Sequence, residues 1–186
     1  MPPLLKKDKA LSLRKLFFYS KSKSAEPQNR LIYYLKRNKS KRVSYALAGE
    51  LLPLINEELA RHQINEMPLL IGLPRSRGAL FEYGFDQADM LCRSLAERCG
   101  IEYFAALKRR RGSNAQKSLT AGERRKNIKN LVYVDKNMRE NLKGRAVILL
   151  DDVVTTGASM SACIDALREC GVKNIICIAI ASDIKI

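Results

Sequence analysis

The chain has 186 residues, 46% of them hydrophobic, which suits one domain with a substantial apolar core. No apolar run approaches the roughly 20 residues of a membrane-spanning helix, and the N-terminus lacks the features of a secretory signal. The five cysteines form no CxxC pair, so neither a disulfide framework nor a zinc ribbon is indicated. A reduced, cytoplasmic location is therefore expected.

The formal net charge of +15 favours anionic partners or substrates and does not specify a fold. Its distribution is uneven. Residues 1–45 hold thirteen Lys and Arg against two acidic residues, and residues 108–130 hold nine against one. The sequence therefore contains two basic segments, separated by a stretch without such an excess.

The first basic segment is expected to precede the main domain. We place an N-terminal segment at residues 1–42 and a single α/β domain at residues 43–186. Residues 1–25 are rich in Ser and Lys, and we expect them to be loosely structured apart from one short strand or helical turn.

Two helices are predicted next, because apolar residues recur at helical spacing in residues 28–37 and 43–62. Pro53 is expected to kink or break the second helix. His62, the single histidine, falls near the end of that helix, and we expect it at the surface.

Short apolar runs then alternate with helical periodicity. We expect strands at residues 69–73, 101–107, 131–134, 146–150 and 174–181, and helices at 85–99 and 157–170. Strands separated by helices imply right-handed crossovers and a mostly parallel sheet flanked by helices. Because ligands bind beyond the carboxyl ends of such strands, chemistry is expected just after residues 73, 107 and 150.

The apolar strand ending at residue 150 runs into Asp151 and Asp152 and then into a helix. The helix start offers unpaired backbone N–H groups and a positive dipole end, and the glycine lets an anion approach closely. The residues of this cradle are Thr155, Thr156, Gly157, Ala158 and Ser159. The alternative is that the acids merely end a strand and Thr156 caps a helix. A polar loop needs neither two acids nor three hydroxyls around a glycine, so a sugar-phosphate site is predicted.

Residues 147–159 also resemble the phosphoribosyl pyrophosphate (PRPP) signature of type I phosphoribosyltransferases. Residues 74–77, 83–87 and 107–127 are similar to stretches of the ComF competence-protein family, and the resemblance covers about residues 30–182. It implies a type I phosphoribosyltransferase-like parallel sheet flanked by helices, with a flexible hood loop.

The chain departs from the family pattern at several positions. Tyr83 stands where the family usually has Arg, Asp86 where it has Asn, and Ser113 where it has Thr. The N-terminal cysteine knuckle of the family has no counterpart here, so no zinc is expected.

The resemblance implies that residues 155–159 hold the 5′-phosphate of PRPP and that Asp151 and Asp152 are the catalytic pair. Mg²⁺ is the expected cofactor, bound through PRPP oxygens and water with this pair nearby. The turn after residue 73 is expected to hold the pyrophosphate through Arg75, Ser76 and Arg77. The alternative for that turn is a solvated basic loop.

Residues 108–130 correspond to the hood loop, whose closure would exclude water from the ribosyl centre. The residues expected to act there are Arg109, Arg111, Gln116, Lys117, Arg124 and Asn127. The alternatives are a disordered basic loop and a nucleic-acid contact.

Two functions from different classes stay open. In the first, a PRPP-binding ComF-family protein assists the uptake or handling of single-stranded DNA together with the competence machinery. In the second, an active phosphoribosyltransferase transfers phosphoribosyl from PRPP to a nitrogen nucleophile and releases pyrophosphate. The basic segments favour the first, and the extended ligand signature favours ligand binding in either case.

Overall fold

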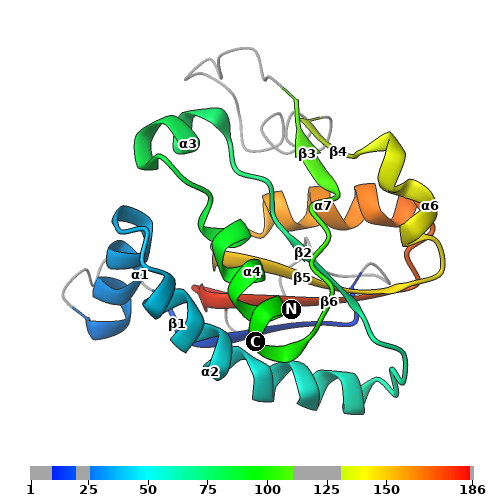
Figure 1. The fold of residues 1–186 in the computed structure, drawn as a ribbon, viewed down its shortest axis with the longest axis horizontal. Coiled ribbons are helices and arrows are strands. Elements are labelled where there is room, and N and C mark those ends of the chain that lie inside the picture. Colours follow the sequence, from blue (N-terminus) through cyan, green and yellow to red (C-terminus); the bar gives the residue numbers. More distant parts are fainter. Residues whose placement is uncertain (1–9, 20–25, 111–130, 185–186) are drawn as a thin grey trace.

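The computed structural model describes residues 10–19, 26–110 and 131–184. Its main sheet is parallel, and its strands in spatial order are β1 (Ser12–Phe18), β6 (Asn174–Ser182), β5 (Ala146–Val154) and β2 (Leu69–Gly72). A separate antiparallel pair consists of β3 (Leu107–Arg109) and β4 (Val132–Val134). Figure 1 shows this pair on the far side of the sheet from α2. The predicted parallel α/β sheet is confirmed.

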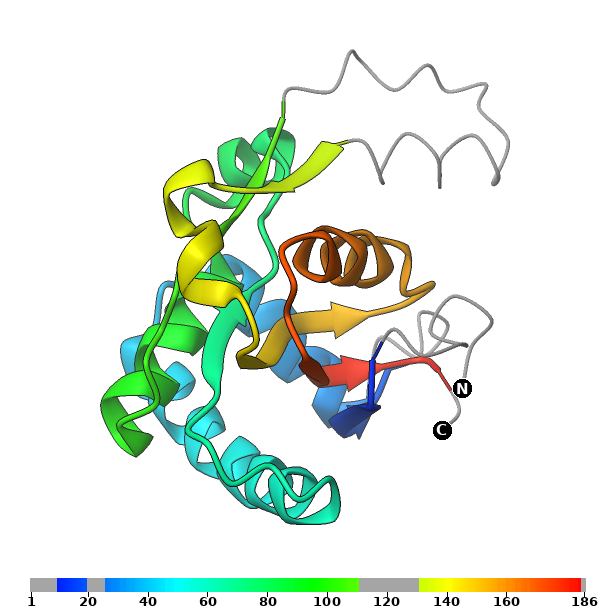
Figure 2. The same cartoon turned by 90° about the vertical axis from the view of Figure 1, so that its right-hand side faces the viewer.

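Helices cover both faces of the sheet. One face carries α1 (Pro27–Arg37), α2 (Lys41–Arg61) and α4 (Gln87–Cys99), and the other carries α7 (Ala158–Glu169). Figure 2 shows α7 between the sheet and the β3–β4 pair. The shorter elements are α3 (Arg77–Tyr83), η2 (Lys136–Met138) and α6 (Arg139–Leu142).

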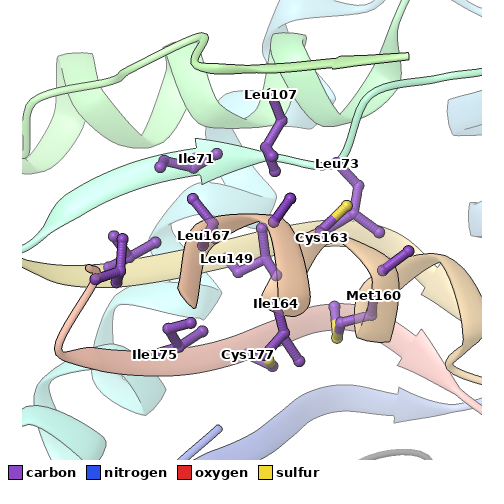
Figure 3. Packing of buried hydrophobic residues seen from close by; sticks show 14 of the residues in the cluster. Ile71, Leu73, Leu107, Leu149, Met160, Cys163, Ile164, Leu167, Ile175 and Cys177 are labelled. Atoms are coloured by element: carbon purple, nitrogen blue, oxygen red, sulfur yellow. The ribbon is translucent and has the colours of Figure 1, made fainter. Parts of the chain in front are cut away.

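The sheet divides the core into two layers because side chains alternate along each strand. Val147 and Leu149 of β5 pack with α7, whereas Ile148 and Leu150 pack with α2 and α4. Figure 3 shows Leu149 among side chains of α7 and β6. Each of these four residues is at most 1% exposed. Burial on both faces explains why this part of β5 is a continuous apolar run in the sequence.

Several elements differ from the sequence-based expectations. α2 continues through Pro53, because its stripe of buried residues, including Leu51 and Ile55, holds both halves against the sheet. β3 and β4 pair with each other rather than joining the parallel sheet, and only an isolated bridge at Tyr103 extends β2 on that side. α3 was not predicted.

The N-terminal segment contributes to the main sheet. β1 pairs in parallel with β6, and α1 buries Ile32 and Leu35 in the α2–α4 layer. Arg14 of β1 donates at 2.7 Å to Glu58 of α2, a carboxylate with no exposed side-chain surface. His62 lies 3.3 Å from the same carboxylate, and its side chain is 22% exposed, so it lies partly buried at the end of α2.

Across the residues that the structure describes, no helix is long and apolar enough to cross a membrane. All five cysteines are free, and Cys92, Cys163 and Cys177 are fully buried. Burial raises the pKa of each of these three thiols, so they are inert packing residues.

Candidate functional site

The carboxyl ends of the four parallel strands meet at one edge of the sheet. β5 continues past its apolar run, so Asp151 and Asp152 lie within the strand, and Asp151 is in register with Ala179 of β6. On the other side of β5, the backbone N–H of Leu73 donates to the carbonyl of Leu150 at 2.9 Å. The turn that follows β2 therefore begins beside the acidic pair.

The turn after β5 forms the predicted cradle at the start of α7. Gly157 adopts a left-handed conformation with φ of 72° at the N-cap and provides no side-chain cap. The first helical bond runs from the N–H of Ser161 to the carbonyl of Gly157, so the preceding N–H groups have no acceptor within the helix. A hollow of about 60 Å³ is lined by Asp151 and residues 153–160. The N–H of Ala158 donates to the hydroxyl of Thr156 at 3.4 Å. The hydroxyls and the positive end of the helix dipole around this hollow favour a small anion.

The two carboxylates are held in different ways. Asp152 is 8% exposed, and its Oδ1 accepts from the N–H of Val153 at 2.8 Å. The Oδ1 of Asp151 accepts from the N–H of Asp152 at 2.9 Å. Burial, followed by the negative charge of Asp152, raises the pKa of Asp151 well above its ordinary value. Two such close acids are stabilised by a cation or by donors on a ligand.

Arg75 connects the turn after β2 to the acidic pair. Its Nη2 lies 3.4 Å from Oδ2 of Asp152, and its guanidinium stacks on the ring of Tyr83, 5.1 Å from the centroid. The side chain is 14% exposed, and the buried Nη1 has no hydrogen-bond partner among the described residues. A buried guanidinium nitrogen without an acceptor is unfavourable, so this geometry favours an incoming oxygen ligand.

The structure describes fewer contacts for the other two residues of the predicted pyrophosphate turn. Ser76 lies next to Arg75 and already takes part in an interaction within the protein. The backbone of Arg77 begins α3, and its side chain lies outside the described part of the structure.

A cavity of about 330 Å³ adjoins this turn. Its wall includes Arg75, Asp86, Tyr103 and Arg109, so one predicted hood residue reaches it from β3. Asp86 caps α4 by accepting from the N–H of Ala88 at 3.0 Å, and it also accepts from the N–H of Arg75 at 3.4 Å. Because Asp and Asn both cap helices well, this departure from the family pattern preserves the local structure.

The remaining predicted hood residues lie outside the residues that the structure describes: Arg111, Gln116, Lys117, Arg124 and Asn127. The described ends of that segment, β3 and β4, form an antiparallel ladder.

Two residues near the site, from α1 and from the end of β1, were not predicted from the sequence. Tyr19 follows β1, is 8% exposed, and has a pKa raised by burial and by Tyr33, with a smaller contribution from Asp152. Lys36 of α1 is close enough for its charge to lower the pKa of Asp151. No local signal marks these residues, because Tyr19 is placed by the pairing of β1 with β6 and Lys36 by the packing of α1 on α4.

The acidic pair also fits the predicted metal ion in part. Carboxylate oxygens suit Mg²⁺, which keeps several waters and shares substrate phosphates. Among the described residues, no group of three or more His, Cys, Asp or Glu could hold a metal. A magnesium ion at Asp151 and Asp152 would therefore need further oxygens from a ligand and from water.

Comparisons with known proteins identify related sequences. Residues 83–185 match the family described as phosphoribosyl transferase domain. The chain is 29% identical over 151 residues to Competence protein F of Haemophilus influenzae, covering 81% of this chain and 66% of that protein. The predicted resemblance to the ComF family is thereby confirmed.

Solved structures share less sequence identity with this chain than Competence protein F does. The glutamine PRPP amidotransferase of B. subtilis, complexed with ADP and GMP, has a TM-score of 0.47 and 17% identity, covering 79% of this chain and 30% of that one. The hypoxanthine-guanine phosphoribosyl transferase of L. donovani has a TM-score of 0.45 and 14% identity. The match covers 75% of this chain and 71% of that one. By its match over residues 83–185, this chain belongs to the phosphoribosyl transferase domain family.

Proposed function

We propose that this protein binds PRPP with Mg²⁺ at the carboxyl edge of its sheet. The 5′-phosphate occupies the cradle of residues 155–159, and the ribose hydroxyls face Asp151 and Asp152. The observation that carries the proposal is the buried Nη1 of Arg75, which has no partner among the residues that the structure describes, while its Nη2 lies 3.4 Å from Asp152. Pyrophosphate oxygens would satisfy this donor beside the acids.

Mg²⁺ would neutralise charge on the pyrophosphate and would be held by the acidic pair, PRPP oxygens and water. Asp151 and Asp152 orient the ribose, the cradle fixes the phosphate, and Arg75 fixes the pyrophosphate. Titration calorimetry with PRPP tests this arrangement. Binding is expected with Mg²⁺ and should weaken at least tenfold when EDTA replaces it. Equal affinity in both conditions would remove the metal from the proposal.

We further propose that the protein assists single-stranded DNA handling. Support comes from its similarity to Competence protein F, of which it spans 66%, and from the net charge of +15. Removing residues 1–25 is a poor test, because it also removes β1 from the sheet. Replacing Lys6, Lys7 and Lys9 by Gln leaves β1 intact and tests the basic N-terminus directly.

The second candidate function is transfer of phosphoribosyl to a nitrogen nucleophile. It is supported by the cavity of about 330 Å³ beside Arg75, which offers space for an acceptor. In this reaction the bond from C1 to the pyrophosphate oxygen breaks, pyrophosphate leaves with the electron pair, C1 bonds to nitrogen, and the nitrogen's proton passes to water. A pyrophosphate-release assay against bases and amines separates the two functions. Release with one acceptor favours the enzyme, and binding without release favours the handling role.

A further inference from the structure

A second recess lies on the layer of α1, α2 and α4, away from the phosphate cradle. It is an open groove of about 790 Å³ between the first turns of α2 and the outer side of α4. We call it the α2–α4 groove. The residues that matter for its chemistry are Lys41, Arg42, Tyr45, Arg93, Glu97 and Tyr103.

The groove is basic. Lys41 and Arg42 are exposed, and within the described part of the chain neither forms an ion pair. Arg93 is different, because Asp89 neutralises it through two contacts of 2.8 and 3.2 Å. Glu97 lines the groove and offsets one charge. Lys41 and Arg42, exposed near the start of α2 and not neutralised by any described residue, therefore favour an anionic partner.

The groove also contains a preformed aromatic platform. The ring of Tyr45 is 42% exposed, and the guanidinium of Arg98 stacks on it at 4.8 Å from the centroid. Arg98 reaches this position because Gly49 has no side chain. A Cβ there would lie 2.9 Å from the guanidinium carbon. The arginine thus rests directly on the backbone of α2, and its planar group is held beside the ring.

A second stacked pair also lines the groove. Arg93 lies over the ring of Tyr103 at 5.4 Å, and the Tyr103 hydroxyl donates to Asp89 at 2.7 Å. Tyr103 also lines the cavity beside Arg75. Tyr103 is therefore shared by the groove and by the cavity next to the proposed PRPP site.

We propose that the α2–α4 groove binds single-stranded nucleic acid, with backbone phosphates at Lys41, Arg42 and Arg98 and a base stacked at Tyr45. A cationic track beside aromatic rings is the usual way to bind a single strand without sequence preference. An intact duplex keeps its bases stacked inside and cannot place one on Tyr45. This inference rests on the nucleic-acid part of the proposed function and assigns it a surface.

The test measures anisotropy of a labelled oligothymidylate of about 16 nucleotides, a length that spans one such site. Tyr45→Ala should weaken binding at least about fivefold, as expected for loss of one base stack. The double variant Lys41→Gln with Arg42→Gln should also weaken binding. It should reduce the steepness of log affinity against log salt concentration by about 1.4, which corresponds to the loss of two phosphate contacts on a single strand. The matched control is Lys136→Gln with Arg139→Gln, which removes the same charge from exposed positions on η2 and α6.

The outcomes separate this inference from the function on which it rests. If the wild type binds the oligonucleotide and the groove variants behave like the control, the groove is not the interface, and the handling role survives. If the wild type does not bind, the handling role fails as well. If polyglutamate displaces the labelled oligonucleotide as well as unlabelled oligothymidylate does, and Tyr45→Ala has no effect, the groove binds anions in general and the proposal is overturned. PRPP affinity should be unchanged in every groove variant.

Discussion

The Nη2 of Arg75 lies 3.4 Å from the Oδ2 of Asp152, and this contact joins the turn after β2 to the acidic end of β5. Two segments 77 residues apart in the chain thereby meet at one edge of the sheet. The contact places a cation against the acidic pair, and the second terminal nitrogen of the guanidinium is buried with no hydrogen-bond partner among the described residues.

Arg75→Ala should weaken PRPP binding by about 10- to 100-fold, because a charge-assisted hydrogen bond contributes about 1.5–3 kcal/mol. The fold should be retained, since Arg75 lies on a turn and contributes to neither core layer. Calorimetry with PRPP and Mg²⁺ measures the loss, and circular dichroism checks the fold. Arg139→Ala, an exposed arginine on α6, is the control. Wild-type affinity in the Arg75 variant would show that this turn does not hold the pyrophosphate.

Gly157→Ala should weaken PRPP binding through the backbone of the cradle. Its φ of 72° is left-handed, where a side chain costs about 1–2 kcal/mol. Gly100 provides a matched control, because it has φ of 69° at the end of α4 with open space around it. Both alanine variants should lose similar thermal stability, and only the Gly157 variant should lose PRPP affinity. Equal PRPP affinities in the two variants would contradict the cradle.

Glu58 should make the stability of the fold depend on pH. Burial alone would raise its pKa, but the Ser12 hydroxyl, Arg14 at 2.7 Å and Arg61 at 3.3 Å outweigh burial and lower it. A lowered folded-state pKa contributes stability above the unfolded value, and this contribution is lost as the pH falls through the folded value. The wild type should therefore lose stability between neutral and acidic pH in part through this group.

The matched variant is Glu58→Gln, which keeps the size of the side chain and removes its charge. At pH 7 it should unfold more easily by about 1–3 kcal/mol, because Arg14 loses a charged acceptor. His62 and Glu57 also face this network, so the comparison uses the difference between the two proteins at each pH. Urea unfolding at pH 7 and at pH 4 measures it. A difference that does not shrink at pH 4 would contradict the assignment.

Gly49→Ala should uncouple stability from nucleic-acid binding. Alanine raises helix propensity by about 1 kcal/mol relative to glycine, so α2 should not be destabilised. The new methyl group would displace Arg98, which now lies 2.9 Å from that position. Melting temperature should stay equal or rise while oligothymidylate affinity falls. Retained affinity would show that the stacked Arg98–Tyr45 pair is not used.

The sheet and the cradle were predictable because their signals are local. The first part of β5, residues 146–150, is an unbroken apolar run, and a strand buried on both faces has that composition. The acids, hydroxyls and Gly157 follow it without interruption, so strand, turn and helix start could be placed from neighbouring residues alone.

β1 was harder to place because its sequence carries Arg14 and Lys15 among apolar residues. The strand lies at the edge of the sheet, and its charges are satisfied by partners distant in the chain. Arg14 contacts Glu58, and Lys15 donates to the carbonyl of Ser182 at 3.3 Å. Tyr19 reaches the site through this strand and Lys36 through the packing of α1 on α4, and no local pattern could indicate either position.

The most direct test of PRPP binding compares the thermal shift produced by PRPP and Mg²⁺ in the wild type and in Asp151→Asn with Asp152→Asn. At a ligand concentration of about 100 times the dissociation constant, binding adds about 2.7 kcal/mol, or roughly 5–10 °C for a chain of this length. Because neutralising two close acids can itself change stability, the shift on adding ligand is the quantity to compare. The wild type should shift and the double variant should not. A wild type without a shift, or equal shifts in both proteins, would contradict a PRPP site at the acidic pair.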